Sequence, residues 1–589
     1  MINSRKACIN RYLTKKTSEE KTRTKKEEFK YEEEVSCIRI GSIYGWNNVR
    51  IKPAFAEEES SSAAAEEVTS AAEEVTSAAA EATTGEVPNY DDVWAEKWAD
   101  VDTSEHVVIN YMTTGDAPTN DATQKMLDEL NAILTEKVNA ELQIYYIGWT
   151  DYLSNYNLTL ARMDGTVDLV GTATDWLDAW PNAKNGAFLE LSDEMLEKYA
   201  PVTYETVSQE DWDQCKYKDN IYFMPEDNYA QWTNHGFAYR LDWAKEAGLE
   251  DGVHSWEDMT TYFKYVSENK DELGVVTPWD SDGTQYSTMA GGWVSSHSDF
   301  VAIDGLAAAA YWGGMKDDLY TIVSPLYTDT DSLVEFAKMM KEWDEMGVWK
   351  TDVLNNTSSD NESDFKLGKT AANQHHTQTW TGLIDKTKAN NPDAEVGFFW
   401  FGEEKQNLVS LSVTHGAMAV SYGSENPERA LMVYDLLRND AECYDLINYG
   451  QKGVQWDVND EGLRITPESY NSDTDGITTN FWWGRNDLLE IRDATKEWDT
   501  IDALYAEYDD VKIAYPYGKF VADVDDIQSY INNINEVNTN YMKQIAFGKY
   551  TGTAEEIVAE YQQALKDAGM DIVIEELQKQ LNEVYGDAE

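Results

Sequence analysis

The sequence predicts an α/β protein with at least two lobes, and two observations carry this prediction. At 589 residues the chain is several times longer than a typical single domain, so it can bury more than one core. From residue 104 onward, short apolar runs alternate with stretches of helical periodicity. Strands that alternate with helices at this spacing indicate a parallel sheet covered on both faces.

The first predicted strands and helices follow one another in a regular order. Buried strands are indicated by "EHVVINYMT" (105–113), "ELQIYYIGW" (141–149) and "VDLVGT" (167–172). Apolar residues recur at helical spacing between the first two strands, and "TDYLSNYNLTLARMDG" (150–165) predicts a helix before the third. Ligands bind at the carboxyl ends of such strands, where the loops bring four side chains toward one edge: Asp116, Trp149, Asp175 and Trp176.

The first hundred residues differ in composition from the rest. Residues 1–55 form an atypical basic N-terminus, and residues 56–103 form a low-complexity acidic linker. Its Ala, Ser, Glu and Thr tract at 56–88 lacks the large apolar residues that would offset the entropy cost of folding. No apolar stretch before residue 57 suits a signal peptide or a membrane span, yet "AFA" (54–56) has the small-x-small pattern of a cleavage site. We expect that residues 1 to about 50 are a mis-assigned or frame-shifted start that has lost its export signal; the alternative is a genuine cytoplasmic extension.

Charge and cysteine content exclude some classes of function. The 47 basic residues against 109 acidic ones give a formal net charge of −62, which repels nucleic-acid phosphates and anionic membrane surfaces. We therefore expect no nucleic-acid partner. The four cysteines lie far apart and form no C-x-x-C pair, so neither a disulfide framework nor a thiolate zinc site is indicated.

Several motifs in order carry a resemblance to a known family. "DFKLGKTAA" resembles a Phe-x-x-Gly-Lys turn, and residues 424–456 resemble a block with Asn-Pro-Glu, a helix and Tyr-Gly-x-x-Gly. The chain resembles the extracellular solute-binding proteins of ABC importers that share the maltose-binding-protein fold, in their larger Gram-positive lipoprotein branch. The segments that carry this resemblance are 239–266, 364–372, 424–456, 514–548 and 553–585.

The resemblance implies a periplasmic-binding-protein-like fold: two α/β lobes with a ligand cleft between them and a hinge that the chain crosses three times. On this sequence the crossings are expected at 225–236, 408–415 and 454–460. The expected segments are 104–232 and 411–460 for the first lobe, and 233–410 and 461–589 for the second, with an insertion or lid in the last of them.

The resemblance also implies a function. A protein of this kind is an extracellular receptor, tethered to the cell surface, which captures an oligosaccharide and delivers it to an ABC permease in the membrane. We expect a monomer that is not an enzyme and needs no cofactor and no metal.

The aromatic content suggests that the ligand is a neutral sugar. The chain has 21 Trp and 35 Tyr residues, and many of the tryptophans stand beside short polar residues. An aromatic ring packs on the C–H face of a pyranose while polar neighbours bond its hydroxyls. Most tryptophans in so long a chain pack in cores, so at most about a third should touch ligand. Beyond the first loops, the expected ligand-binding residues are Asn228, Trp232, Trp293, His375, His376, Gln378, Trp380, His415 and Trp482.

Two adjacent histidines stand out in "FKLGKTAANQHHTQTW" (365–380), because the chain has only seven. If this stretch is extended, His375 and His376 point to opposite faces, and one of them can face the cleft. No histidine four positions away and no His-Glu-x-x-His pattern supports a metal site. A neutral imidazole both donates and accepts hydrogen bonds, so we interpret the pair first as sugar-binding, then as structural.

Other chemistry is weakly indicated. "NSDTDGITTNFW" (471–482) resembles a calcium loop but has Trp482 where a bidentate Glu should stand, so we interpret it as a turn. We find no nucleophile elbow, Walker loop or dinucleotide motif. Two alternatives stay open: a carbohydrate-active enzyme or lectin with the same aromatic cleft, and a peptide receptor. A peptide receptor would favour a basic anchor, and Arg240 and Arg485 are the only arginines in these loops.

Overall fold

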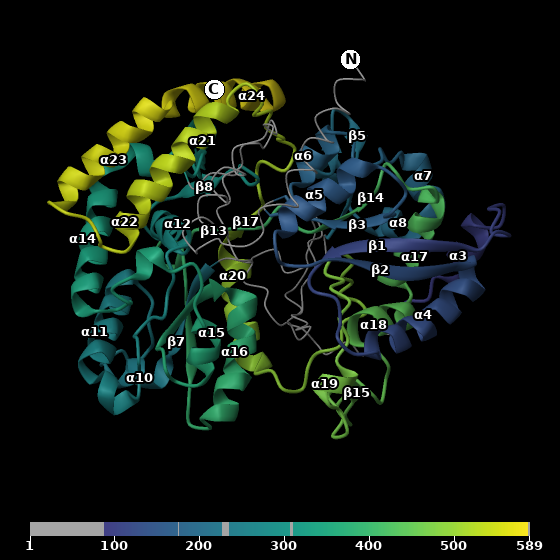
Figure 1. Ribbon diagram of the computed structural model, residues 1–589, viewed down its shortest axis with the longest axis horizontal. Helices are drawn as coiled ribbons and strands as arrows, with labels where there is room; N and C mark the ends of the chain where they lie inside the picture. Colours follow the sequence, from purple (N-terminus) through teal and green to yellow (C-terminus); the bar gives the residue numbers. More distant parts are fainter. Residues whose placement is uncertain (1–86, 175, 227–234, 307–309, 587–589) are drawn as a thin grey trace, which may run out of the picture. The chain divides into compact units, whose positions relative to one another are not determined.

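The computed structural model describes residues 87–174, 176–226, 235–306 and 310–586, which contain two main β-sheets with separate cores (Figure 1). Every described residue belongs to one unit of the chain, Arg50–Glu589. None of the helices in the described ranges combines the length and the hydropathy that a membrane span needs.

The first sheet has five strands in the order β2-β1-β3-β14-β6. Strand β1 (Val107–Thr114) pairs in parallel with β2 (Ala140–Ile147) and with β3 (Leu169–Thr172). Strand β14 (Ala417–Val420) runs antiparallel to β3 and to β6 (Met224–Pro225). The predicted alternation of strands and helices is confirmed, because two connecting helices separate the three parallel strands.

The two connecting helices are α4 (Ala122–Val138) and α5 (Tyr152–Arg162), which lie on opposite faces of the sheet (Figure 1). Residues Met126, Leu130 and Leu134 of α4 are fully buried at the spacing of one helical face. The helix ends at Asn139, whose left-handed backbone (φ 49°) is tolerated by Asn better than by most residues. Apolar periodicity and this cap together explain why the chain is helical here and stops where β2 begins.

Helix α17 (Pro427–Asn439) forms the centre of the first core. Proline at its first turn suits a helix start, and every residue from Arg429 to Asn439 is buried. The helix contacts α4, β1, α7 (Asp193–Tyr199), α8 (Pro201–Thr206) and α18 (Ala441–Tyr449). Its buried Arg438 donates a hydrogen bond to the carbonyl of Pro225 (2.9 Å), which fixes the end of β6. The remaining elements of this part are α3 (Asp91–Lys97), α6 (Ala179–Lys184), α9 (Gln209–Gln214), β4 (Lys216–Tyr217) and β5 (Asn220–Ile221).

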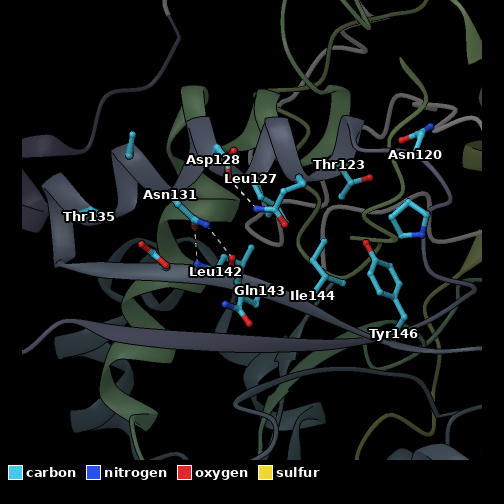
Figure 2. Close-up of a pocket in the computed structure, with 14 residues that line it drawn as sticks. Asn120, Thr123, Leu127, Asp128, Asn131, Thr135, Leu142, Gln143, Ile144 and Tyr146 are labelled. Atoms are coloured by element: carbon cyan, nitrogen blue, oxygen red, sulfur yellow. Dashed lines mark hydrogen bonds between the residues drawn. The ribbon is translucent and has the colours of Figure 1, made fainter. Parts of the chain in front are cut away.

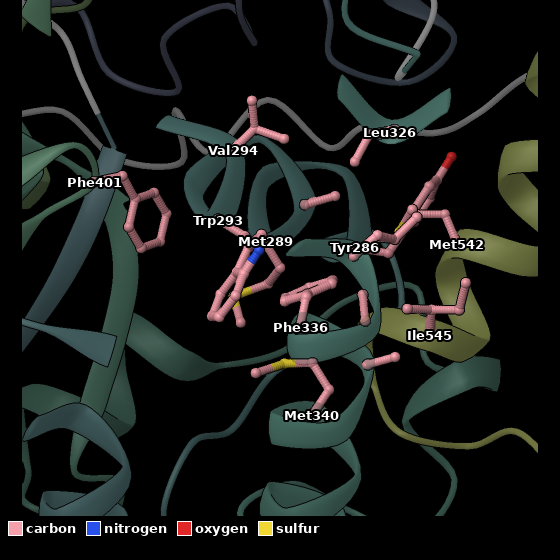
Figure 3. Packing of buried hydrophobic residues seen from close by; sticks show 14 of the residues in the cluster. Tyr286, Met289, Trp293, Val294, Leu326, Phe336, Met340, Phe401, Met542 and Ile545 are labelled. Atoms are coloured by element: carbon pink, nitrogen blue, oxygen red, sulfur yellow. The ribbon is translucent and has the colours of Figure 1, made fainter. Parts of the chain in front are cut away.

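The second sheet is antiparallel, with β7 (His235–Arg240) between β11 (Ala372–His376) and β12 (Val396–Trp400). Helices α11 (Trp256–Leu273), α12 (Tyr286–His297) and α14 (Thr330–Met346) bury a large aromatic and methionine-rich core beside it. Figure 3 shows Met289, Trp293, Phe336 and Phe401 converging in this core. Further elements here are α10 (Leu241–Glu246), β8 (Phe300–Ala302), β9 (Gly313–Met315), β10 (Asp318–Val323), α13 (Pro325–Thr328), α15 (Asn361–Lys366) and α16 (Thr377–Asn390).

The C-terminal helices complete the second core. They are α21 (Gln528–Val537), α22 (Lys543–Ala546), α23 (Ala554–Ala568) and α24 (Met570–Tyr585), drawn in olive and yellow in Figure 1. A capping box of Thr553 and Glu556 starts α23, and Gly569 (φ 104°) ends it. Contacts of α23 with α14 and of α24 with β10 bury their apolar stripes against residues far earlier in the chain.

The chain passes between the two parts three times. It leaves the first sheet after Pro225 and enters the second at His235; residues 227–234 lie outside the described ranges. It returns between β13 (Leu408–Val409) and β14. The third passage differs from the expectation at 454–460: Trp456 and Leu489 are buried together beside α18, whereas α20 (Trp498–Val511) packs on Trp400 of the second part. Residues 461–489 therefore belong with the first sheet, because burial of these apolar side chains holds them there.

Candidate ligand-binding site

The loops after β1, β2 and β3 meet at the carboxyl edge of the first sheet. The backbone N–H of Trp149, just after β2, donates a hydrogen bond to Oδ1 of Asp116, just after β1 (3.2 Å). Trp176 follows β3 and stacks with Trp149 at 6.4 Å between ring centroids. Three strand ends thus contribute to one patch, as their parallel arrangement requires. Asp175, predicted to join them, lies outside the described residues.

Five aromatic side chains, which we name the aromatic cluster, form this patch: Trp149, Tyr152, Trp176, Trp482 and Trp483. Near-parallel pairs are Trp149 with Trp176 (29°), Trp149 with Trp482 (6.5 Å, 21°) and Trp176 with Trp483 (5.9 Å, 26°). Trp149, Trp176 and Trp482 are half-buried, whereas Trp483 is only 2% exposed. Rings fixed in nearly parallel planes offer flat apolar faces of the kind that pack on sugar C–H groups.

The sequence predicts three of the five rings, together with the neighbouring Asp116. Tyr152 and Trp483 were not expected. Both carried a signal: Tyr152 lies in the same loop as Trp149, and Trp483 follows Trp482 directly. Neither signal tells on which side of the backbone a ring will lie, because that depends on the fold of the segment.

A second group of polar side chains lies where β7 and β11 pair. His235, His375, His376 and His415 interact with one another, and we name them the histidine cluster. The rings of His375 and His376 are 4.2 Å apart, so the expectation that they point to opposite faces is wrong. His376 ends β11 and caps α16, where its Nδ1 accepts a hydrogen bond from the Thr379 N–H (3.2 Å).

Burial keeps His235, His375 and His376 neutral. It lowers the pKa of His235 to about 3, with further lowering by His375 and His415, and it lowers the pKa of His375 to about 4. It holds the pKa of His376 well below the usual range as well. Uncharged imidazoles at neutral pH are donors and acceptors of hydrogen bonds rather than cations. Such a group suits hydroxyl partners better than carboxylates or phosphates.

Two predicted ligand tryptophans prove to be core residues. Trp293 is 2% exposed; its ring stacks on His297 at 3.6 Å and its Nε1–H donates to Ser332 Oγ (2.9 Å), as its place in Figure 3 illustrates. Trp380 is 3% exposed and stacks on Phe398 at 5.5 Å. Both stand on the buried faces of helices, α12 and α16, rather than in polar loops. Gln378 is also buried on α16, at 7% exposure, and Asn228 and Trp232 lie outside the described ranges.

The described residues hold no group of three or more His, Cys, Asp or Glu side chains arranged for a metal ion. In the stretch 471–482, residues Ser472–Asp475 form a short helix, α19, whose N-cap Asn471 accepts the Asp473 N–H through its side chain. This is the turn that the sequence predicts.

A polar groove of about 690 Å³ lies elsewhere on the first sheet, between α4 and the edge strand β2 (Figure 2). Asn131 bridges it: its side chain accepts the Leu142 N–H (2.7 Å) and donates to the Leu142 carbonyl (3.1 Å). One amide side chain thereby satisfies the N–H and the C=O of Leu142, which an edge strand would otherwise leave open to pairing with another chain.

Comparisons with known proteins agree with this architecture. The family described as "Domain of unknown function (DUF3502)" matches residues 516–585, the region of α21–α24. A carbohydrate ABC transporter substrate-binding protein of Streptococcus pneumoniae serotype 4 is 23% identical over 495 residues, which cover 82% of this chain and 92% of that protein.

Solved structures share the fold. The N-glycan transport solute binding protein NgtS from Streptococcus pneumoniae superposes with a TM-score of 0.63 at 19% identity, over 81% of this chain and 99% of that one. Its complex with Man5GlcNAc superposes with a TM-score of 0.56 at 20% identity, over 82% of this chain and 98% of that one. The alginate-binding protein AlgQ2, without calcium ion, gives 0.57 at 16% identity, over 81% and 98%.

These results confirm the predicted fold class. The matched relatives are named as transport proteins, in agreement with the prediction that the chain is not an enzyme. In sequence and in fold, the chain is therefore a relative of the substrate-binding proteins of carbohydrate ABC transporters.

Proposed function

We propose that the chain is an extracellular substrate-binding receptor which captures a neutral oligosaccharide on the aromatic cluster and delivers it to an ABC permease in the membrane. The observation that carries this proposal is the aromatic cluster itself: three separate segments of the chain bring four half-buried aromatic rings, packed on the buried Trp483, to the carboxyl edge of one sheet. Aromatic faces beside a carboxylate are the side-chain types that pack on a sugar and bond its hydroxyls.

The electrostatics of the described residues support a neutral ligand. His235, His375 and His376 are uncharged, and the two arginines that could have anchored a carboxylate are engaged elsewhere. Arg240 Nε donates to Asp242 (2.8 Å), and Arg485 Nε donates to Asp487 (2.8 Å). A peptide terminus or a uronic acid would therefore find these arginines already paired, which favours a neutral sugar over both.

The names of the relatives support the same class of ligand. One is a carbohydrate ABC transporter protein, and the other was solved with Man5GlcNAc. We extend to this chain the receptor role and the oligosaccharide class, and we add that it acts as a monomer held at the cell surface. The expected linker 56–103 is folded in its last part, because α3 lies there and Trp94 is buried in the first core, where its Nε1–H donates to Asp435 (2.7 Å).

Isothermal titration calorimetry tests the ligand. The titrants are Man5GlcNAc, a neutral α-glucan oligosaccharide of similar length, an alginate oligosaccharide and a tripeptide. We expect saturable binding of at least one neutral glycan and none of the alginate or peptide. Binding of the peptide alone would overturn the sugar assignment, and binding of alginate alone would overturn the neutral class.

Chromatography of the recovered sugar tests the alternative of an enzyme. A receptor returns the bound glycan intact after long incubation, whereas a carbohydrate-active enzyme returns shorter products. Hydrolysis by the purified protein would contradict the receptor role.

A further inference from the structure

One segment of the aromatic cluster comes from far along the chain. Residues 476–486, which we name the strap, run across the carboxyl ends of β1 and β2. Near its start, the Thr478 N–H donates to Thr123 Oγ1 of α4 (2.9 Å), and the Tyr146 hydroxyl of β2 donates to the Thr478 carbonyl (2.6 Å). These bonds join the strap to two elements more than three hundred residues earlier in the sequence.

Asn480 joins the middle of the strap to β1. Its carbonyl accepts hydrogen bonds from the Tyr111 hydroxyl (2.6 Å) and from Thr113 Oγ1 (2.9 Å), and its side-chain Nδ2 donates to the Thr114 carbonyl (2.8 Å). Three hydrogen bonds thus tie one residue to the C-terminal half of β1. Its backbone lies in the left-handed region (φ 46°), which Asn adopts more readily than most residues.

Two glycines of the first sheet make room for the strap. A Cβ at Gly115 would lie 2.0 Å from Nδ2 of Asn480, and the φ of 127° at Gly115 already disfavours other residues. A Cβ at Gly171, in β3, would lie 2.1 Å from Nε1 of Trp483. The strap therefore packs directly on the backbone of the sheet, without intervening side chains at these two points.

The sequence Phe481-Trp482-Trp483 alternates between core and site. Phe481 is buried edge-on against Tyr111 (5.6 Å, 76°), and Trp483 is buried with its carbonyl accepting the Tyr434 hydroxyl (2.9 Å). Trp482 stands between these two anchors and is half-buried, with its ring 6.5 Å from Trp149. Because both neighbours point into the core, the ring between them is held toward the other tryptophans.

We propose, on the basis of the proposed function, that the strap is a fixed part of the sugar-binding surface rather than a moving lid, and that Asn480 is the positioning residue that orients Trp482 in it. Asn480 does not touch the sugar. It holds the turn that determines where the Trp482 ring lies relative to Trp149 and Trp176, and so determines which sugar faces the cluster accepts.

The test compares Asn480→Ala with Asn480→Gly and with a matched control, Asn139→Ala. Glycine keeps the left-handed backbone but loses the side-chain bond, whereas alanine loses both. Asn139 is an Asn with the same backbone conformation and a similar bond, from Nδ2 to the Thr103 carbonyl (2.8 Å), but it lies at the amino end of β2. The readouts are the near-UV circular dichroism of the full chain, calorimetric affinity for Man5GlcNAc and the melting temperature.

Asn480→Ala should weaken the near-UV bands of the coupled tryptophans and lower affinity about tenfold, the scale of one aromatic contact. Asn480→Gly should retain part of the near-UV bands and part of the affinity. If the alanine variant does not fold, the glycine variant tests the role of Asn480 instead. Asn139→Ala should lower the melting temperature while leaving the near-UV bands and the affinity unchanged.

Three results would overturn the inference. These are unchanged bands and affinity in Asn480→Ala, equal changes in Asn139→Ala, and altered bands with an unchanged affinity. The dichroism needs no ligand, so it still decides the role of the strap if the unmodified chain binds no glycan. A failure of the proposed function is thereby distinguished from a failure of this inference.

Discussion

Trp482 and Trp380 show how burial separates two residues of the same type. Both stand beside polar residues in the sequence, yet Trp482 is half-buried in the aromatic cluster while Trp380 is 3% exposed and stacks on Phe398. A ring that already packs on all sides stabilises the fold and has no face left for a ligand. Solvent exposure, rather than the flanking residues, is the property that separates them.

Trp482→Ala should lower affinity for the bound glycan about tenfold or more, because one large apolar contact contributes about 1–3 kcal/mol. Calorimetry measures this change. Trp380→Ala is the matched control: it should lower the free energy of unfolding by about 3–5 kcal/mol through the cavity it leaves. Equal affinity of the unmodified chain and Trp482→Ala would contradict our choice of site.

The histidine cluster should make stability depend on pH. Burial lowers the pKa of His235 to about 3 and of His375 to about 4, below the value of about 6.5 in an unfolded chain. The unfolded state therefore binds more protons than the folded state between these values, and stability falls as pH drops from about 6.5 toward 4.

Melting curves measured across this pH range check the prediction. The double variant His235→Gln, His375→Gln should show a smaller loss of melting temperature on acidification than the unmodified chain. His106→Gln is the control, since His106 is exposed at the surface beside Glu141. An identical pH profile for the double variant and the unmodified chain would refute a role for the cluster.

At the scale of elements, the first sheet depends on contacts that bring distant segments together. Helix α17 ties the end of β6 through Arg438, and the strap packs on the bare backbone of β1 and β3 at Gly115 and Gly171. An element that approaches a sheet this closely tolerates no added side chain below it. The carboxyl edge of the sheet is therefore fixed by residues that follow it by several hundred positions.

Gly171→Ala should displace the Trp483 ring and so reduce both the melting temperature and the affinity for the glycan, because its Cβ would lie 2.1 Å from Nε1 of that ring. Gly382→Ala is the control. Gly382 lies in the helix α16, and a Cβ added there would have Lys496 Nζ as its nearest neighbour, at 3.9 Å. Helix propensity favours alanine over glycine at such a position by about 1 kcal/mol. A Gly171→Ala variant with the same melting temperature as Gly382→Ala would show that the strap can move away from the sheet at no cost, and would contradict the close packing.

For the whole molecule, the charge of −62 is the dominant electrostatic feature. Like charges repel one another more in the compact state than in the extended chain, and salt screens this repulsion. We expect the melting temperature to rise between low and physiological ionic strength. Affinity for a neutral glycan should change little over the same range. Scanning calorimetry and titration in matched buffers measure both; an affinity that falls steeply with salt would indicate a charged ligand instead.

The loops that hold Asp116, Trp149 and Trp176 could be located because strand ends follow directly from a local apolar pattern. The sequence does not predict the place of Tyr152 and Trp483, and Trp293 and Trp380 pack in cores instead of facing a ligand. The reason is that the buried face of a helix or of the strap depends on partners far away in sequence. The third passage of the chain was placed too early for the same reason, since Trp456 is buried by Leu489 and α18.

The sequence by itself determined the α/β class, the order of the first strands and helices, the excess of negative charge and the likeness to solute-binding proteins. These properties depend on composition and on short-range periodicity, which are written in consecutive residues. Only the tertiary structure decided which tryptophans form the aromatic cluster, that four histidines lie together, and that the strap returns to the first sheet. Such contacts join residues hundreds of positions apart, and burial in a shared core selects them from many pairings that the sequence alone allows.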